Sequence, residues 1–245
     1  LGDVYKRQRQ HIFRFFSSLL ILCMSTSICA QEDEKTTAID TTNQKVKPYG
    51  LRIGIDLSKP IRSFLDDNYN GLEVMGDFRV SNNYYIAAEL GNETRTVDDF
   101  TNIDVTSKGS YIKAGFNYNA YNNWLGMNNL IYAGVRAGFS TFTQELNSYT
   151  ISTSNTFFEE DVRTDTREFD GLNAVWLEFQ LGIQAELFNN LYLGLNLQIK
   201  NRIVETGPDG FENVYIPGFG KTTDESKFGV GYGYTLSYLI PLFNK

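Results

Sequence analysis

Cysteine and histidine are nearly missing from this chain of 245 residues, which contains two cysteines, Cys23 and Cys29, and one histidine, His11. All three lie within the first thirty residues, so the remainder of the chain contains neither type. This absence excludes thiolate zinc sites, disulfide bonds, cysteine nucleophiles and histidine general bases from everything after residue 30. We therefore expect no catalytic residue, no metal site and no cofactor, although a mechanism that uses carboxylates alone, with the acidic cluster of residues 159–170 as its source, stays open.

Long apolar runs are also missing after residue 30, where no stretch of eighteen consecutive apolar residues occurs. This part of the chain therefore offers no transmembrane helix. Any membrane insertion of this part must be made by strands, because only helices and closed barrels satisfy their backbone groups in lipid.

The first thirty residues have the pattern of a secretory signal peptide. Four basic residues precede an apolar run from Phe15 to Met24, and small residues close the segment at Ala30. We predict a signal peptide over residues 1–30, and we give its first residues, 1–8, no functional weight because they resemble read-through sequence. Residues 31–48 are polar without an apolar period, which predicts a flexible periplasmic leader.

Acidic residues outnumber basic ones, 29 to 22, and the formal net charge is −7. Because the predicted signal peptide carries four basic residues and one acid, its removal lowers the net charge to about −10. Such an acidic chain argues against a nucleic-acid partner.

Eight segments after residue 48 alternate apolar and polar residues with a period of two, as a strand with one apolar face does. The clearest is 191–202, and the others are 51–57, 72–80, 84–91, 112–118, 131–139, 175–186 and 228–242. Their connections are long at 58–70, 95–108, 147–172 and 204–226, short at 81–83 and 189–190, and intermediate at 119–129. Long and short connections alternate in outer-membrane barrels. We predict an all-β, eight-stranded antiparallel up-and-down transmembrane β-barrel over residues 49–243.

The polar faces of these segments are rich in Gly, Gln, Asn and Tyr and carry charges of both signs. An eight-stranded barrel has an interior just wide enough for side chains, so these charges are expected to pair inside it. The predicted lumen charge network consists of Arg52, Asp56, Glu73, Asp77, Arg79, Glu89, Lys113, Arg136, Glu178, Glu186, Lys200 and Arg202. Small residues such as Gly231 are expected to make room for the long ones.

Aromatic residues mark both rims and the last strand. Several Tyr and Trp residues suit the headgroup level of a bilayer, namely Tyr84, Tyr118, Tyr121, Trp124, Tyr232, Tyr234 and Tyr238. Phe243, near the end of the last strand, is similar to the terminal aromatic recognised by the outer-membrane assembly machinery. With the signal, the leader and eight alternating strands, the chain resembles small outer-membrane β-barrel proteins of the OmpX and OmpA-transmembrane type within the porin superfamily.

The resemblance covers about residues 49–243 and is one of architecture. It implies a place in the outer membrane of a Gram-negative envelope, with lipid and lipopolysaccharide as neighbours and the assembly machinery as a partner during biogenesis. It transfers no catalytic or binding residue, because a fold does not decide a function.

An acidic cluster lies in the long connection 147–172 and consists of Glu159, Glu160, Asp161, Asp165, Glu168 and Asp170. We interpret it as a solvated external tip; no spacing there matches a calcium loop. The predicted function is a non-enzymatic envelope protein with a side-chain-filled lumen, which has a structural or surface-interaction role through its long external loops. Two alternatives stay open: a narrow passive pore, and a soluble lipocalin-like barrel that binds a ligand in an apolar calyx.

Overall fold

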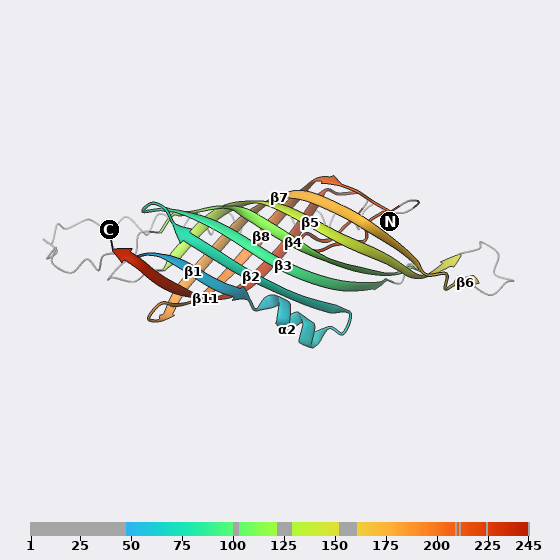
Figure 1. Cartoon of the computed structure of the whole chain (residues 1–245), viewed down its shortest axis with the longest axis horizontal. Coiled ribbons are helices and arrows are strands. Elements are labelled where there is room, and N and C mark those ends of the chain that lie inside the picture. Colours follow the sequence, from blue (N-terminus) through green and yellow to red (C-terminus); the bar gives the residue numbers. More distant parts are fainter. Residues whose placement is uncertain are drawn as a thin grey trace, which may run out of the picture. The chain divides into compact units, whose positions relative to one another are not determined.

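The computed structural model describes residues 48–99, 103–121, 129–151, 161–208, 210, 212–223 and 225–244, whose strands form one barrel (Figure 1). The predicted signal peptide and the predicted leader up to residue 47 lie outside the described residues. No helix within the described ranges is long and apolar enough to cross a membrane.

Eight strands make the ring, and each is antiparallel to both neighbours. They are β1 (Pro48–Asp56), β2 (Tyr69–Arg79), β3 (Tyr84–Asp99), β4 (Ile103–Asn119), β5 (Leu130–Ile151), β7 (Arg167–Phe188), β8 (Leu191–Glu205) and β11 (Phe228–Asn244). Sequential strands pair with each other, and β1 pairs with β11, with Leu51 opposite Ile240. The predicted eight-stranded antiparallel up-and-down barrel is confirmed.

The two ends of the barrel differ in their connections. At the turn end, Ser81–Asn83 and Asn189–Asn190 join neighbouring strands; Asn190 has a φ of 66°, a left-handed conformation that asparagine tolerates in tight turns. At the loop end, the long connections include the short strand β6 (Asp161–Arg163), which extends the sheet beside β5. The same end carries the helix α2 (Ser58–Leu65) and a hairpin of β9 (Tyr215–Ile216) and β10 (Gly220–Lys221).

Two connections predicted as long loops are wrong in extent. The predicted loop 95–108 is mostly strand, because β3 continues to Asp99 and β4 begins at Ile103. The predicted loop 147–172 likewise shrinks, because β5 continues to Ile151 and β7 begins at Arg167. The apolar alternation stops where the outward-facing residues become polar, although the backbone ladder runs on beyond that level.

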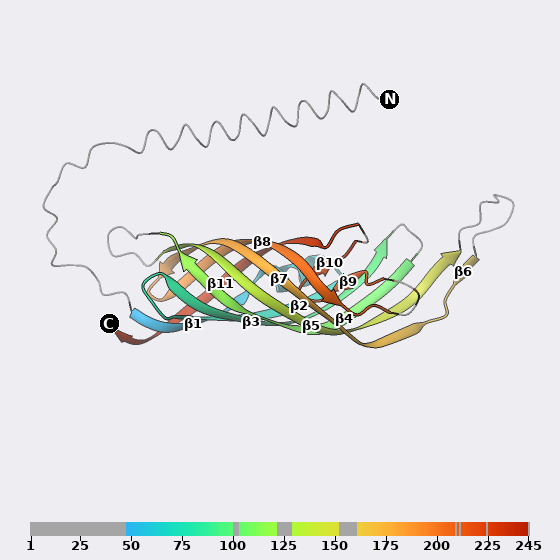
Figure 2. The same cartoon turned by 90° about the horizontal axis from the view of Figure 1, so that it is seen from above.

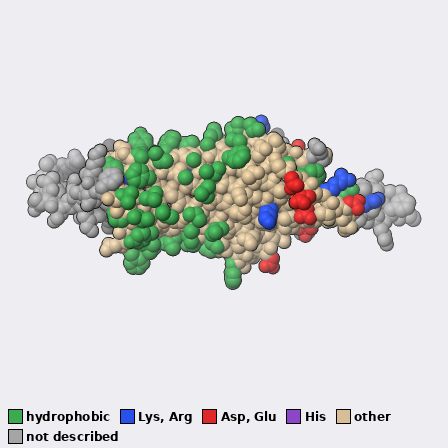
Figure 3. Space-filling view, viewed as in Figure 1, with side chains coloured by type: hydrophobic (Ala, Val, Ile, Leu, Met, Phe, Trp, Pro, Cys, Tyr) green, Lys and Arg blue, Asp and Glu red, His purple; other side chains and the backbone are tan. Residues whose placement is uncertain are grey.

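Apolar side chains face outward over a broad belt. On β7, for example, Leu177, Leu181 and Ile183 are each about half exposed, while the alternate residues Glu178 and Gln180 are buried. The space-filling view shows apolar side chains spread over the barrel from the turn end past its middle, and charged side chains gathered towards the loop end (Figure 3). The barrel therefore turns its apolar faces outward and its polar faces inward.

The hairpin β9–β10 closes the lumen at the loop end. We call residues 213–222 the plug; β9 and β10 lie within the outline of the barrel in Figure 2. Ile216 and Phe219 of the plug pack against Tyr111, Phe142 and Trp176 from the barrel wall. Trp176 is fully buried and meets the Phe219 ring edge-on at 6.1 Å between centroids. An apolar core therefore lies inside the barrel, on the loop-end side of the charged residues.

Candidate functional site: the lumen charge network

Ten of the twelve residues predicted for the lumen charge network are buried inside the barrel. The buried residues are Arg52, Asp56, Glu73, Asp77, Arg79, Glu89, Lys113, Arg136, Glu178 and Lys200. Glu186, at the turn end, and Arg202, at the loop end, are half-buried instead. Glu186 accepts a hydrogen bond from the amide of Asn190, and Arg202 pairs with Glu205, so both stabilise the rims rather than the centre.

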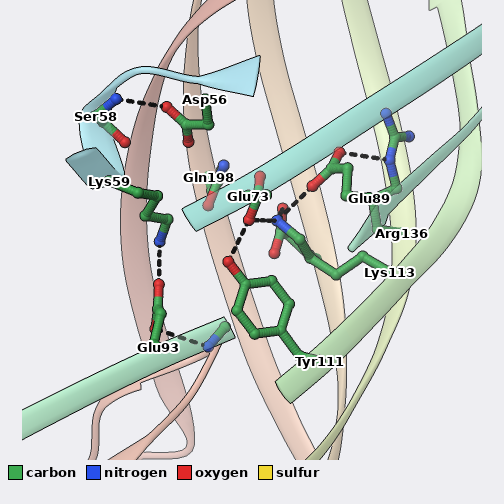
Figure 4. Close-up of polar contacts among 12 residues, drawn as sticks. Asp56, Ser58, Lys59, Glu73, Glu89, Glu93, Tyr111, Lys113, Arg136 and Gln198 are labelled. Carbon is green, nitrogen blue, oxygen red and sulfur yellow. Dashed lines mark hydrogen bonds and ion pairs between the residues drawn. The ribbon is translucent and has the colours of Figure 1, made fainter. Parts of the chain in front are cut away.

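Lys113 on β4 is the centre of the network (Figure 4). Its Nζ lies 3.2 Å from Glu73 Oε2, contacts Glu89 Oε2, and lies 3.9 Å from Glu178 Oε1. These carboxylates come from β2, β3 and β7, so one cation links strands on several sides of the ring. A buried charge is tolerated only when it is paired in this way.

Arg136 continues the network on β5. Its Nε donates to Glu89 Oε1 over 3.1 Å, and its Nη2 donates to Asn117 Oδ1 over 2.8 Å. Glu89 therefore lies between two cations, Lys113 and Arg136. The amide of Gln180 also donates to both Glu89 and Glu178, which joins the acids of β3 and β7.

Arg52 and Asp77 form a separate pair nearer the turn end. The guanidinium donates twice to the carboxylate, from Nε over 2.9 Å and from Nη2 over 2.8 Å. It also lies 5.0 Å from the ring centroid of Tyr192 and 5.6 Å from that of Tyr85. This planar, two-bond pairing suits arginine and fixes the register of β1 against β2.

Lys200 links the network to the plug. Its Nζ donates to the carbonyl oxygens of Gly218 and Phe219, over 2.8 and 3.3 Å, and lies 3.8 Å from Glu178 Oε2. The expected close approach of a long side chain to a glycine is present here, because a Cβ on Gly231 would lie 3.2 Å from Lys200 Nζ.

Glu93 on β3 is a second centre, which the sequence reasoning missed. Its carboxylate accepts hydrogen bonds from Lys59 of α2, from the hydroxyls of Tyr69 and Tyr215, and from the amide of Gly218. One carboxylate thereby holds the helix and the plug against the barrel wall. Continuing the alternation of β3 two residues past Gly91 would have pointed Glu93 inward.

Charges of both signs lie inside the barrel in similar numbers. Among the described residues, the buried carboxylates are Asp56, Glu73, Asp77, Glu89, Glu93 and Glu178, and the buried cations are Arg52, Arg79, Lys113, Arg136 and Lys200. Lys59 and Arg202, whose side chains are 20% and 10% exposed, add two further cations towards the loop end. Buried charges of one sign are thus offset by charges of the other.

The predicted acidic cluster contributes nothing to this network within the described residues. Asp165, Glu168 and Asp170 are exposed at the loop end. Glu159, Glu160 and the side chain of Asp161 lie outside the described residues, as does the predicted rim residue Trp124. Among the described side chains, no group of three or more acids gathers where it could hold a metal ion.

Comparisons with known proteins identify a family and a distant structural likeness. The chain matches the family described as "Domain of unknown function (DUF6048)" over residues 12–245, and it belongs to that family. No curated protein matches the chain. Among solved structures, it is similar to Ail, the attachment invasion locus protein of Yersinia pestis, with 10% identity, a TM-score of 0.37, and coverage of 78% of this chain and 95% of that one. It is similar to Acinetobacter baumannii CarO2 with 10% identity, a TM-score of 0.35, and coverage of 79% and 98%.

Proposed function

We propose that this member of the DUF6048 family is an outer-membrane β-barrel protein with a closed lumen, which has a structural or surface-interaction role at its loop end. The observation that carries the proposal is the distribution of side chains across the barrel wall. Large apolar side chains are exposed on every strand of the ring, whereas charged side chains are buried inside. Burial of polar groups with exposure of apolar ones is unfavourable in water and favourable in a bilayer.

The same distribution argues against a lipocalin-like barrel, which needs an apolar calyx to hold its ligand. The centre of this lumen is occupied by Lys113 and its carboxylate partners, and the apolar part of the interior is already filled by the plug.

A closed lumen is favoured over a narrow pore for two reasons. The interior cations and acids pair with one another across the barrel, and the plug packs Ile216 and Phe219 over them. We therefore expect negligible ion conductance. The proposed role is not enzymatic: the residues after position 30 contain no histidine or cysteine, and the described acids of the cluster, Asp165, Glu168 and Asp170, are exposed.

The proposed surroundings follow from this placement. Lipid would cover the apolar belt, lipopolysaccharide would flank the loop end, and the outer-membrane assembly machinery would insert the chain. Contacts with other molecules would be made by the loop end, where Asp165, Glu168 and Asp170 are exposed to solvent.

Fractionation of cells that express the full chain tests the location, and electrophoresis of unboiled and boiled samples tests barrel closure. We expect recovery in the outer membrane and a heat-dependent shift in mobility. A soluble protein whose mobility is the same before and after boiling would refute the proposal. Current measurements in planar bilayers test whether the lumen conducts ions. Sustained single-channel currents would indicate an open pore instead of a closed lumen.

A further inference from the structure

The barrel wall is incomplete beside the end of β1. The pairing of β1 with β11 ends at Asp56 opposite Thr235, and its pairing with β2 ends at Ile55 opposite Val74. Towards the loop end, β2 and β11 run on to Tyr69 and Phe228, and no described strand lies between them. Over this stretch, the ladder of β11 runs along β8, and among the described strands none pairs with its other edge.

The helix α2 covers this opening and is attached mainly to one side of it. Towards β2 and β3, Ser63 Oγ accepts a hydrogen bond from Gly71, Arg62 lies 4.1 Å from the Tyr69 ring centroid, and Lys59 pairs with Glu93. Towards β11, the bonds are made just before the helix, between Leu57 and Tyr234 and between Tyr234 and Asp56. Within the described residues no hydrogen bond joins α2 to residues 228–233.

A cavity of about 360 Å³ lies between α2 and β11. Its lining includes the inward-facing Lys200 and Gly231, but also Leu197, Val230 and Tyr232, which face outward. A cavity that touches both faces of one strand must pass the free edge of that strand. It therefore connects the lumen side of the wall with the outer surface, and we call it the lateral cleft.

The lining of the lateral cleft carries more cations than acids. Its cations are Lys59 and Arg62 from α2 and Lys200 from β8, and among the described lining residues Glu93 is the one acid. Lys59 pairs with Glu93, and Lys200 lies 3.8 Å from Glu178. Arg62 lies 3.6 Å from Asp66, and its side chain is 41% exposed. Arg62 is therefore the cation of the lining that is most accessible to an anionic group.

The mouth of the cleft is apolar. Among the described residues, the six most exposed large apolar side chains are Phe64, Val230, Leu65, Phe188, Leu197 and Phe228. Five of these six, all but Phe188, belong to α2 or to the β8–β11 wall beside the cleft. On β8 and β11, Leu197 and Val230 continue the outward-facing apolar alternation of their strands, and on β2 the outward-facing residues change from Leu72 to the polar Asn70. The cleft therefore lies where the apolar part of a bilayer meets its headgroups.

We propose that the lateral cleft binds an anionic phosphate lipid of the surrounding bilayer. The phosphate contacts the cations of α2 and β8, and an acyl chain leaves past Val230 and Phe64 onto the outer face of the barrel. Charge-assisted hydrogen bonds from arginine and lysine supply the headgroup affinity. The inference rests on the proposed membrane location, since the lipid enters from the bilayer.

The test measures lipid retention by native mass spectrometry on the full chain, purified in a non-ionic detergent and titrated with dioleoylphosphatidylglycerol. Arg62→Gln removes a partly exposed cation of the cleft, and Arg167→Gln removes an exposed cation of β7 outside it. We expect about tenfold weaker retention for Arg62→Gln, the effect of losing one charge-assisted hydrogen bond, and unchanged retention for Arg167→Gln.

Two competitors identify the part of the lipid that binds. Dioleoylglycerol, which lacks the phosphate, should not be retained, and excess inorganic phosphate should not displace the phospholipid. Equal retention by both variants, retention of dioleoylglycerol, or displacement by free phosphate would each overturn the proposal. Heat-dependent mobility of the same samples shows whether the barrel is folded, so a failed lipid site is distinguished from a failed membrane barrel.

Discussion

At the scale of single residues, Lys113 is the side chain whose loss should cost most. Replacing it by methionine keeps its length but leaves Glu73, Glu89 and Glu178 without their shared cation. Removal of one partner from a buried ionic group typically costs about 3–5 kcal/mol. We expect Lys113→Met to lower the free energy of unfolding by that amount, measured by urea titration of the barrel in detergent micelles.

Arg202→Met is the matched control. The side chain of Arg202 is 10% exposed and pairs at the rim with Glu205, which is 29% exposed. Its loss leaves one acid that water can still reach, so it should cost less than the loss of Lys113. Adding Glu89→Gln to Lys113→Met should recover part of the loss, because one uncompensated acid is removed. Equal costs for Lys113 and Arg202, with no recovery in the double variant, would mean that the central charges do not interact.

For single residues, the sequence predicts which side chains face the lumen but not which of them pair. A period of two assigns Lys113, Arg136 and Glu178 to the inside without any contact information, because side chains alternate across a strand. Which charges pair cannot be predicted in the same way: Arg136 meets Glu89 from β3, since pairing depends on the stagger between strands. Glu93 was missed because the apolar half of its alternation ends at Leu90.

At the scale of elements, the sequence predicts only a long loop over residues 58–70, whereas the structure has the helix α2 there. Ile61, Phe64 and Leu65 nevertheless have helical spacing and all face outward, and Pro60 lies in the first turn, where proline is tolerated. The plug was missed for a different reason. Its two strands have two residues each, too short for any periodic signal, and their position depends on Tyr111 and Trp176 of distant strands.

The connection after α2 should respond to acid. Burial raises the pKa of Asp66, but the hydrogen bond and charge of Arg95 lower it further, so this pKa lies below its ordinary value. The ionised Asp66 therefore stabilises the folded protein above the pKa of the unfolded chain, about 3.9. This stabilisation is lost as the pH falls through the lowered pKa of the folded protein. We expect α2 to loosen between about pH 5 and pH 2 in the unmodified chain and to show little such change in Asp66→Asn.

Hydrogen exchange of the amides of residues 58–68 measures this loosening. Because exchange itself depends on pH, the two proteins are compared at each pH rather than across the range. Identical profiles for the unmodified chain and for Asp66→Asn would show that the contact with Arg95 does not hold the helix.

The plug should be separable from the barrel. Phe219→Ala removes the ring that meets Trp176. Truncation of a buried phenylalanine costs about 3–5 kcal/mol, and here we expect this loss to weaken the packing of the plug against the barrel wall. In a Trp124→Phe background, where Trp176 is the one tryptophan, we expect acrylamide to quench its fluorescence more strongly after the substitution. Heat-dependent mobility should persist, because the ring of strands is intact. Unchanged quenching would indicate that the plug is held by Glu93 and Lys200 alone.

At the scale of the whole molecule, the apolar belt is the feature that distinguishes a membrane barrel from a soluble one. Leu181 is 52% exposed on the outer face of β7, in the middle of the strand. In a bilayer, Leu181→Lys should cost about 2–4 kcal/mol. Thr141→Lys, at an exposed outward position of β5 beyond the belt, should cost little. Folding into lipid vesicles under urea measures both, and a harmless Leu181→Lys would place the outer face in water.

The seam between β1 and β11 decides the order of assembly. Every other pairing in the ring joins strands that follow each other along the chain, apart from short insertions, whereas the seam joins its first and last strands, with Pro48 opposite Asn244. The hairpins can therefore pair early, but closure must wait until the final strand is available, and the contacts of the seam have the longest loop to close. Until then the sheet is open, with two unpaired edges that can recruit foreign strands. Closure of the barrel by its last strand therefore competes with aggregation. A chaperone that shields the two open edges would favour the native ring.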